Sequence, residues 1–171
     1  SKDKGRTVSN YGGWQSNNLS LQENVLKDLI IEIEKNLVSF KEPLALRKEF
    51  KLTVLNLWAN VNKRGAVNIP HLHPRSVLSG VYYVTFPDNS GRLRLMHPNP
   101  NHFSIFSFLG GLEKLVEKST VFTMENVEFV TKPGALVIFP SHLYHYVLPN
   151  LSDDARISFS FNVTMKKEKK I

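Results

Sequence analysis

Residues 155–164 read ARISFSFNVT, and this short stretch alternates strictly between apolar and polar side chains. An alternation with period two is typical of a β-strand, because successive side chains point to opposite faces. One face carries Ile157, Phe159, Phe161 and Val163, and the other carries Arg156, Ser158, Ser160, Asn162 and Thr164. The ordinary interpretation is a surface strand whose polar face lies in water. The histidine-containing segments nearby favour a second interpretation, in which the polar face lines an internal cavity.

Several other short segments have the composition of strands, and turn sequences separate them. They are residues 50–60, 77–86, 91–97, 126–130, 135–139 and 145–148. One helical pattern precedes them over residues 20–40, where Ser20 and Glu23 predict a capping box. Many strands with one packed helix predict a sandwich or barrel, and the less regular residues 98–120 are expected to form an insertion over one of its mouths.

Size and composition predict a single domain over residues 1–171, since 171 residues with 42% hydrophobic content can build one core. No apolar run approaches the roughly 20 residues that a membrane-spanning helix needs, and no secretory leader is recognisable, so we expect a cytoplasmic protein. The chain has no cysteine. Any metal must therefore be held by His, Asp or Glu.

The net charge of +7 lies mostly in the two ends, SKDKGR and KKEKKI. Such short charged segments are ordinarily solvated, so we expect basic tails at residues 1–6 and 166–171. No zinc finger, RNP-like aromatic motif or helix-turn-helix pattern is recognisable, so nucleic acid is only a minor alternative as a partner. A membrane is not an expected partner either.

Two histidine-containing segments suggest a metal site. HLHP at 71–74 places His71 and His73 two residues apart, so an extended strand would point both the same way. The stretch FPSHLYHYVLPN adds His142 and His145 directly after the buried-strand pattern PGALVIF. Two histidines and a third group on adjacent strands can form one face of an octahedron, leaving positions for substrate and oxygen. Arg156 suits an anionic partner, because its planar fork binds a carboxylate in two places at once.

In combination, these segments resemble a known family. The stretches NLWANV, HLHPRSVLSGVYYV, PGALVIFPSHLYHYVLPN and RISFSFN are similar to the small 2-oxoglutarate/Fe(II)-dependent oxygenases of marine bacteria and phages, and YGGWQSNNL fits the same group. GVYYVTFPDNSGRLRLMHP is also similar to a strand pair of prolyl hydroxylases. The resemblance spans roughly residues 14–162. It implies a mostly β fold, a double-stranded β-helix or jelly roll with one packed N-terminal helix, in the cytoplasm of a bacterial or phage-infected cell.

The resemblance also implies roles for single residues. His71 and His145 would be the two catalytic histidine ligands of iron, and Arg156, Ser158 and Tyr83 would bind the distal carboxylate of 2-oxoglutarate. His73 stands where most of the superfamily has Asp, so a three-histidine site is our first choice. If His73 is not a ligand, a two-histidine site or an overlooked carboxylate such as Glu125 would complete the coordination. Iron affinity is expected to fall as the pH drops through the histidine range, near 6.5 for an unperturbed ring.

The implied activity is that of an iron(II)- and 2-oxoglutarate-dependent dioxygenase, a hydroxylase that converts 2-oxoglutarate to succinate and carbon dioxide. The prolyl-hydroxylase-like strands favour a peptide or protein side chain or an amino-acid-like molecule as substrate, and a nucleotide-linked molecule stays open. The alternative from another class is a non-catalytic cupin-like metal-binding or assembly module. We expect His97, His102 and His142 to be bystanders. Asn56 and Asn162 would either orient substrate or tie strands together. The oligomeric state is left open.

Overall fold

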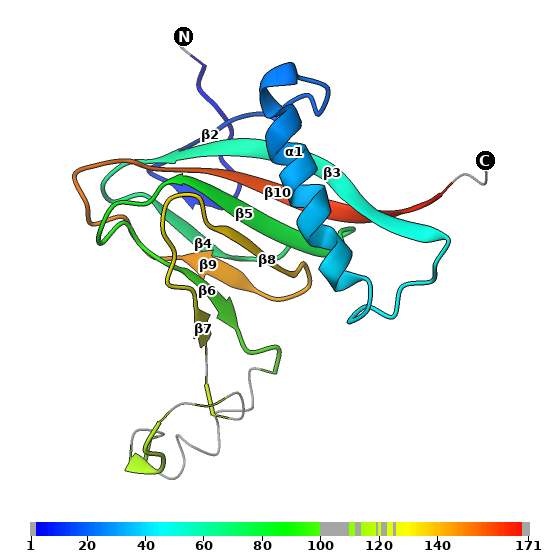
Figure 1. Ribbon diagram of the computed structural model, residues 1–171. Coiled ribbons are helices and arrows are strands. Elements are labelled where there is room, and N and C mark those ends of the chain that lie inside the picture. Colours follow the sequence, from blue (N-terminus) through cyan, green and yellow to red (C-terminus); the bar gives the residue numbers. More distant parts are fainter. Residues whose placement is uncertain are drawn as a thin grey trace.

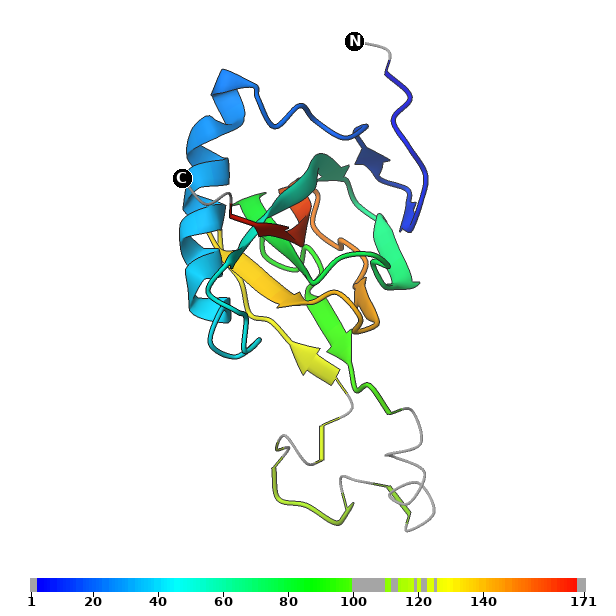
Figure 2. The ribbon, with the colours of Figure 1, turned by 90° about the vertical axis from the view of Figure 1, so that its right-hand side faces the viewer.

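Two antiparallel sheets face each other in the computed structural model, which describes residues 3–99, 110–111, 114–118, 120, 123–124 and 126–168. The major sheet has the strand order β2-β3-β10-β5-β8, with bounds Trp14–Gln15, Phe50–Asn62, Arg156–Lys167, Leu78–Thr85 and Leu136–Pro140. The minor sheet has the order β1-β4-β9-β6-β7, with bounds Asn10–Tyr11, Val67–His71, His145–Val147, Leu93–Met96 and Asn126–Glu128. Figures 1 and 2 show the two layers. The predicted double-stranded β-helix is therefore confirmed.

The α-helix α1 (Lys27–Leu37) covers the outer face of the major sheet (Figure 1). Ile33 and Leu37 of the helix pack against the apolar face of β10, where Phe161 and Val163 are fully buried. Leu52, Val54 and Leu57 of β3 and Leu78 of β5 belong to the same core. The apolar face of β10 thus faces the helix, so its polar face must face the minor sheet. The second interpretation of ARISFSFNVT is the correct one.

Close packing on the helix side requires glycine at one position of β5. Gly80 lies opposite Phe161 of β10, and a Cβ built on Gly80 would come 2.3 Å from Phe161 Cζ and 2.7 Å from the Val137 carbonyl oxygen. Only glycine fits there, because no real Cβ makes contacts that short. Gly80 therefore lets the ring of Phe161 lie flat against the major sheet.

The space between the sheets is only partly filled by apolar side chains. A second, smaller core lies there, formed by Val81, Tyr83, Leu93, Leu95, Val137 and Phe139. Most other side chains that β3 and β10 point inward are polar, and many of them are buried. The two sheets therefore enclose a polar cavity beside a small dry core.

The helix begins later than the sequence predicted. A 3-10 turn, Asn24–Leu26, precedes α1, whose N-cap residue is Leu26 and lacks a side-chain cap hydrogen bond. The expected capping box is wrong: the Glu23 N–H donates to the carbonyl of Ser20, and the Ser20 hydroxyl accepts instead from the Gln22 N–H. The Ser20–Glu23 segment thus forms a separate turn before the helix starts.

Strand β4 was not predicted, because VNIPH contains a proline and few strand-forming residues. It forms at the minor sheet through pairing with β1 and β9, with an irregularity between Asn68 and His71. The insertion expected at residues 98–120 falls mostly outside the described residues.

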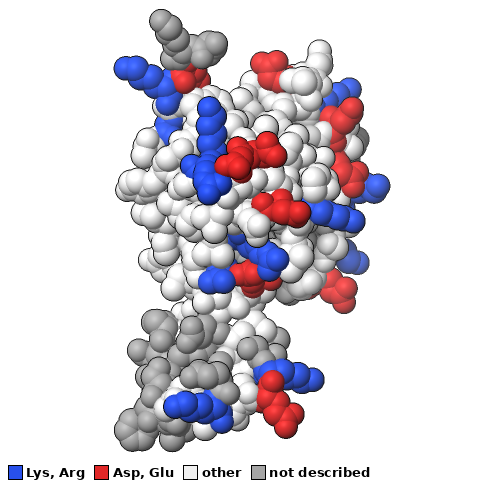
Figure 3. Space-filling view, turned by 90° about the vertical axis from the view of Figure 1, so that its left-hand side faces the viewer, with Lys and Arg blue, Asp and Glu red and all other residues white. Residues whose placement is uncertain are grey.

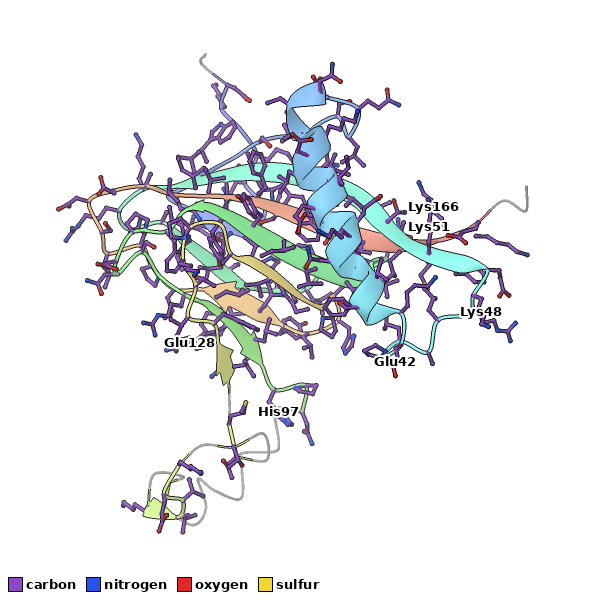
Figure 4. The ribbon with its side chains drawn as sticks, in the orientation of Figure 1. Glu42, Lys48, Lys51, His97, Glu128 and Lys166 are labelled. Atoms are coloured by element: carbon purple, nitrogen blue, oxygen red, sulfur yellow. The ribbon has the colours of Figure 1, made fainter. Side chains whose placement is uncertain are left out.

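Near both ends of the described chain, the backbone forms hydrogen bonds with other parts of the fold, unlike a solvated tail. The Arg6 N–H donates to the carbonyl of Gln15 at 2.8 Å. Strand β10 continues to Lys167, and the Glu168 N–H donates to the carbonyl of Glu49 at 2.8 Å. Lys51 and Lys166, opposite one another in the β3–β10 register, appear together at this end in Figure 4. Among the described residues no helix is long and apolar enough to cross a membrane, and the cytoplasmic location stays a prediction.

Candidate active site

Three histidines come together on the inner side of the minor sheet. His71 is the last residue of β4 and His145 the first residue of β9, and the two lie directly opposite in the register of the sheet. His73 lies in the loop after β4, where its N–H donates to the Ser141 carbonyl at 3.1 Å. The sequence predicted that a strand would place His71 and His73 on one side. The strand ends at His71, and the loop brings His73 to the same place.

The spacing of the three rings suits a single metal ion. Their centroids lie 4.3 Å apart for His71 and His145, and 5.0 Å apart for each of the other two pairs. One nitrogen from each ring lies within 4.8 Å of the other two. Imidazole nitrogens bind a first-row metal at about 2.0–2.1 Å, so three donors around one ion must lie within a few ångströms of each other. The donor set therefore fits iron(II).

Backbone hydrogen bonds orient two of these rings. His71 Nδ1 donates to the Ile69 carbonyl at 2.7 Å, and His145 Nδ1 donates to the Leu143 carbonyl at 3.0 Å. Each ring thereby keeps its proton on Nδ1 and leaves the lone pair of Nε2 for a metal, as in many metal sites. The Ser9 hydroxyl lies 3.3 Å from His71 Nε2. Aromatic rings pack against two of the histidines: Trp58 contacts His73, and Phe139 contacts His145.

Burial keeps all three imidazoles neutral. Desolvation lowers the pKa of His73 to about 3, with further lowering from the neighbouring His145 and His71. Desolvation also lowers the pKa of His145 to about 4, against the opposing effect of its hydrogen bond to Leu143. The pKa of His71 is lowered for the same reason, and its bond to Ile69 partly offsets this. Neutral imidazole is the form that binds metal, so the site is ready for an ion well below pH 7.

A buried cation lies on the major sheet, facing the same cavity. Arg156 is only 2% exposed, at the start of β10. Its Nη1 donates to the carbonyls of Ser90 and Gly91, whereas Nη2 is buried and has no hydrogen-bond partner among the described residues. An unpaired buried donor costs about 1–3 kcal/mol, and more when it is charged. A carboxylate bound in the cavity would remove that cost, which fits 2-oxoglutarate.

Tyr83 and Ser158 lie next to Arg156. Ser158 is two residues along β10, and Tyr83 lies opposite it on β5. Burial raises the pKa of Tyr83 to about 12, although the positive charge of Arg156 acts in the other direction. Burial lowers the pKa of Arg156, and Tyr83 partly offsets this. The tyrosine therefore keeps its proton at neutral pH and can donate a hydrogen bond to an anion that Arg156 binds.

One cavity of about 390 Å³ connects these two groups. Its wall includes the three histidines and Arg156, Tyr83 and Ser158, so all the predicted site residues border the same space. None of the residues that line it in the described part of the chain is Asp or Glu. Amides are frequent on the wall: Gln15, Asn18, Asn56, Asn60, Asn62, Asn68 and Asn162.

No described carboxylate lies where it could replace His73 as a ligand. Glu128 binds Arg92 and Arg94 at 2.7 Å each, and these hydrogen bonds lower its pKa (Figure 4). Asp88 is exposed in the β5–β6 connection. Glu125 lies outside the described residues. Among the described residues, the three histidines are therefore the group at this cavity that could hold a metal ion.

The two expected bystander histidines that the structure describes do not line the cavity. His97 is labelled in Figure 4 beyond the end of β6, and its Nδ1 accepts from the Asn99 N–H. His142 is exposed, and His102 lies outside the described residues. Of the two asparagines left open, Asn162 accepts a hydrogen bond from the Ser79 hydroxyl at 2.8 Å. Asn56 differs, because its Oδ1 is buried without a partner in the described structure.

Sequence reasoning missed the contribution of the N-terminal segment and of β3. Arg6, Ser9, Gln15 and Asn18 line the cavity. The β3 signal was readable, because NLWANVN places asparagines at 56, 60 and 62 on one face, as β10 does with its own polar residues. No local pattern marks the N-terminal residues, since they reach the cavity only through pairing with β3 and β4.

Fold and site together define a class: a double-stranded β-helix with a histidine metal site and a buried arginine facing one cavity. The family model "Putative 2OG-Fe(II) oxygenase" matches residues 56–162, which is more than half of the chain. The chain belongs to this family of iron(II)- and 2-oxoglutarate-dependent oxygenases. Iron(II) and 2-oxoglutarate are accordingly its cofactor and co-substrate, and the enzyme class predicted from the sequence is confirmed.

Solved structures with the same fold include several oxygenases. A prolyl-4-hydroxylase from Pseudomonas putida has a TM-score of 0.56 at 16% identity, over 93% of this chain and 73% of that chain. HygX from Streptomyces hygroscopicus, with nickel and 2-oxoglutarate bound, has a TM-score of 0.56 at 10% identity, over 92% and 72%. A prolyl hydroxylase from Trichoplax adhaerens, in complex with a hypoxia inducible factor peptide, has a TM-score of 0.52 at 15% identity, over 95% and 65%. A search of curated proteins finds no match.

Proposed function

We propose that His71, His73 and His145 hold the iron, and that Arg156, Tyr83 and Ser158 bind the distal carboxylate of 2-oxoglutarate. The observation that carries this assignment is that one cavity is bordered both by three histidine rings that could bind a metal and by an arginine with an unpaired donor. Three neutral imidazoles lie within 4.8 Å of one another, and the buried Nη2 of Arg156 lacks a partner among the described residues. A five-carbon keto diacid has one group for each of these places.

The protein residues have separate tasks in this proposal. The Nδ1 hydrogen bonds to Ile69 and Leu143 hold the tautomers of His71 and His145 that present Nε2. Arg156 is held by the Ser90 and Gly91 carbonyls, so that Nη2 faces an incoming carboxylate. When bound, iron(II) supplies the activation of oxygen that couples decarboxylation of 2-oxoglutarate to oxidation of a C–H bond. Trp58 and Phe139 shield two of the histidine rings from water.

The prime substrate is proposed to be a peptide or protein side chain or an amino-acid-like small molecule. The first solved structure reported above is a prolyl-4-hydroxylase, and another holds a peptide, which supports this class. Fold alone does not determine substrate. The cavity wall adds its own requirement, since hydrogen-bonding amides line it together with apolar side chains such as Trp58, Val81 and Phe139.

Succinate formation tests the residue assignment. The wild type should convert 2-oxoglutarate to succinate only with iron(II), even slowly and without prime substrate. His145→Ala and Arg156→Ala should each lose this activity. Arg64→Ala serves as the control, because Arg64 pairs with Asp153 outside the cavity and should leave turnover unchanged. Wild-type rates in either cavity variant would refute the role assigned to that residue.

A further inference from the structure

A second arginine, Arg6, lines the same cavity from the N-terminal segment. Its backbone is held in place on both sides: its N–H donates to the Gln15 carbonyl at 2.8 Å, and its carbonyl accepts from Asn10 Nδ2 at 3.2 Å. Its side chain is exposed and forms no hydrogen bond or ion pair with any described residue. A cation is thus positioned at the wall of the cavity with its donors free.

Three other surface arginines pair with carboxylates, whereas Arg6, Arg47 and Arg75 have no ion pair with any described residue; of these three, only Arg6 lines the cavity. Figure 3 shows acidic and basic side chains interspersed over one face of the molecule. Arg64 pairs with Asp153, and Arg92 and Arg94 both pair with Glu128, each at 2.7 Å. The two arginines that line the cavity have no such carboxylate among the described residues. One of them, Arg156, already has an anion assigned to it.

The backbones of Arg6 and Arg156 are well separated. Its backbone pairs with β2, β2 lies beside β3, and β3 lies beside β10, which carries Arg156. Neighbouring strands are about 4.8 Å apart, so three spacings separate the two backbones by roughly 14 Å. Both ends of 2-oxoglutarate are accounted for by Arg156 and the histidines. Arg6 is therefore available to a different molecule.

The charges around the cavity indicate the nature of that molecule. Imidazole binds a metal in its neutral form and so adds no negative charge, and no Asp or Glu of the described chain lines the cavity. The two positive charges of iron(II) are then balanced only by the two negative charges of 2-oxoglutarate. The charges of Arg156 and Arg6 remain in excess at this cavity. Such a field favours an anionic second ligand.

We propose that the prime substrate carries a carboxylate or phosphate group, and that Arg6 binds this group at the cavity wall. This inference rests on the proposed function, because it takes the histidine and Arg156 sites as already filled. The planar fork of arginine binds either oxyanion in two places. Gln15, on the strand that pairs with the Arg6 backbone, and the cavity-lining Asn18 offer neutral donors beside it. Arg6 is thus a specificity-determining residue.

Matched peptide-like probes test the inference by binding rather than by turnover. We would titrate the full chain, loaded with zinc and 2-oxoglutarate, with N-acetyl-aspartate amide, N-acetyl-phosphoserine amide and the neutral isostere N-acetyl-asparagine amide. Calorimetry should show tighter binding of at least one anionic probe than of the neutral one. Which of the two anions binds more tightly distinguishes a carboxylate from a phosphate substrate. Arg6→Gln should weaken the anionic probe by about tenfold or more, the effect of losing a charge-assisted hydrogen bond.

Three comparisons make the result decisive. Arg6→Lys should retain part of the preference, and Arg47→Gln, which removes an exposed arginine outside the cavity, should retain all of it. The affinity for 2-oxoglutarate should be the same in Arg6→Gln as in the wild type. Equal binding of neutral and anionic probes, no binding of any probe, or a preference that survives in Arg6→Gln would each overturn the inference. Failure of the wild type to bind 2-oxoglutarate would instead refute the proposed function.

Discussion

The two faces of the major sheet differ sharply in chemistry, although the same strands make both. On the outer face, Phe161 and Val163 of β10 pack with α1 in a dry core. On the inner face, Arg156 and Ser158 of the same strand border a polar cavity. Stability is thereby concentrated on the helix side. The cavity side is left free for groups that a hydrophobic core would exclude, so changes on the two faces should have separable effects.

The largest effect is expected for a histidine on the cavity side. His73→Ala should weaken iron binding and abolish succinate formation, because only two ring donors would remain. His73→Asp should rebuild the usual two-histidine, one-carboxylate set and keep some metal binding. Metal titration followed by calorimetry measures both. Full iron affinity and wild-type turnover in His73→Ala would mean that a two-histidine site suffices or that Glu125 completes the coordination.

On the helix side, Phe161→Ala should remove about 3–5 kcal/mol from the free energy of unfolding, since a fully buried ring leaves a cavity behind. Urea unfolding measures the change. The contrast between the two faces predicts that the variant, while folded at low temperature, still binds 2-oxoglutarate with wild-type affinity. A large loss of that affinity with little loss of stability would show that the faces are not separable.

Replacing Arg156 should affect 2-oxoglutarate binding more than it affects folding. Arg156→Ala should weaken 2-oxoglutarate binding by about 2–5 kcal/mol, because the ligand carboxylate would be buried without its partner. Arg156→Lys should recover only part of this, since a point charge cannot replace the fork. The free energy of unfolding should change less, because the loss of the Nη1 hydrogen bonds to Ser90 and Gly91 is partly offset by the removal of a buried donor without a partner. Calorimetry and urea unfolding, run together, check both halves; unchanged 2-oxoglutarate affinity in Arg156→Ala would contradict the assignment.

The histidine site should make the metal-free protein sensitive to acid. The folded pKa values of His73 and His145 lie near 3 and 4, below the ordinary 6.5, so the unfolded chain binds more protons between these limits. Stability is therefore fully present above pH 6.5 and is lost as the pH falls toward 3. Urea unfolding with a chelator should show this slope, and His73→Ala should reduce it. A slope that is the same in His73→Ala would exclude His73 as a source of the acid sensitivity.

The same pKa values change the expected pH dependence of iron binding. From the sequence, iron affinity was expected to fall near pH 6.5, the pKa of an unperturbed histidine ring. With folded pKa values near 3 and 4 for two of the ligands, competition from protons at these rings begins only at lower pH, as long as the chain stays folded.

The smallest effect is expected at the far end of β10. Truncation after Thr164 removes the pairing of Met165, Lys166 and Lys167 with β3. It also removes Lys166, whose charge lies opposite the like charge of Lys51 and disfavours the pairing. We expect a loss of about 1 kcal/mol or less in unfolding free energy, and unchanged turnover. A truncated chain that melts as the wild type does but has lost activity would show that this end contacts the substrate.

The sequence by itself determined the elements whose signals are local. The period-two alternation of residues 155–164 predicted β10, and the helical period of residues 20–40 predicted the helix, although its start was displaced. The spacing of His71 and His73, the later His145, and Arg156 supported the proposed site through the family resemblance. Strands and helices can be predicted in this way because their periods depend on neighbouring residues.

Only the tertiary structure decided which face of β10 lies inside, and what completes the cavity. Ser9 meets His71 across 62 positions of sequence, and Asn60 meets Ser160 across 100. No local pattern in the sequence encodes such contacts, because they arise when distant strands pair and close the space between two sheets. For the same reason Arg6 looked like part of a solvated tail. Pairing of its backbone with Gln15 places it instead at the wall of the cavity.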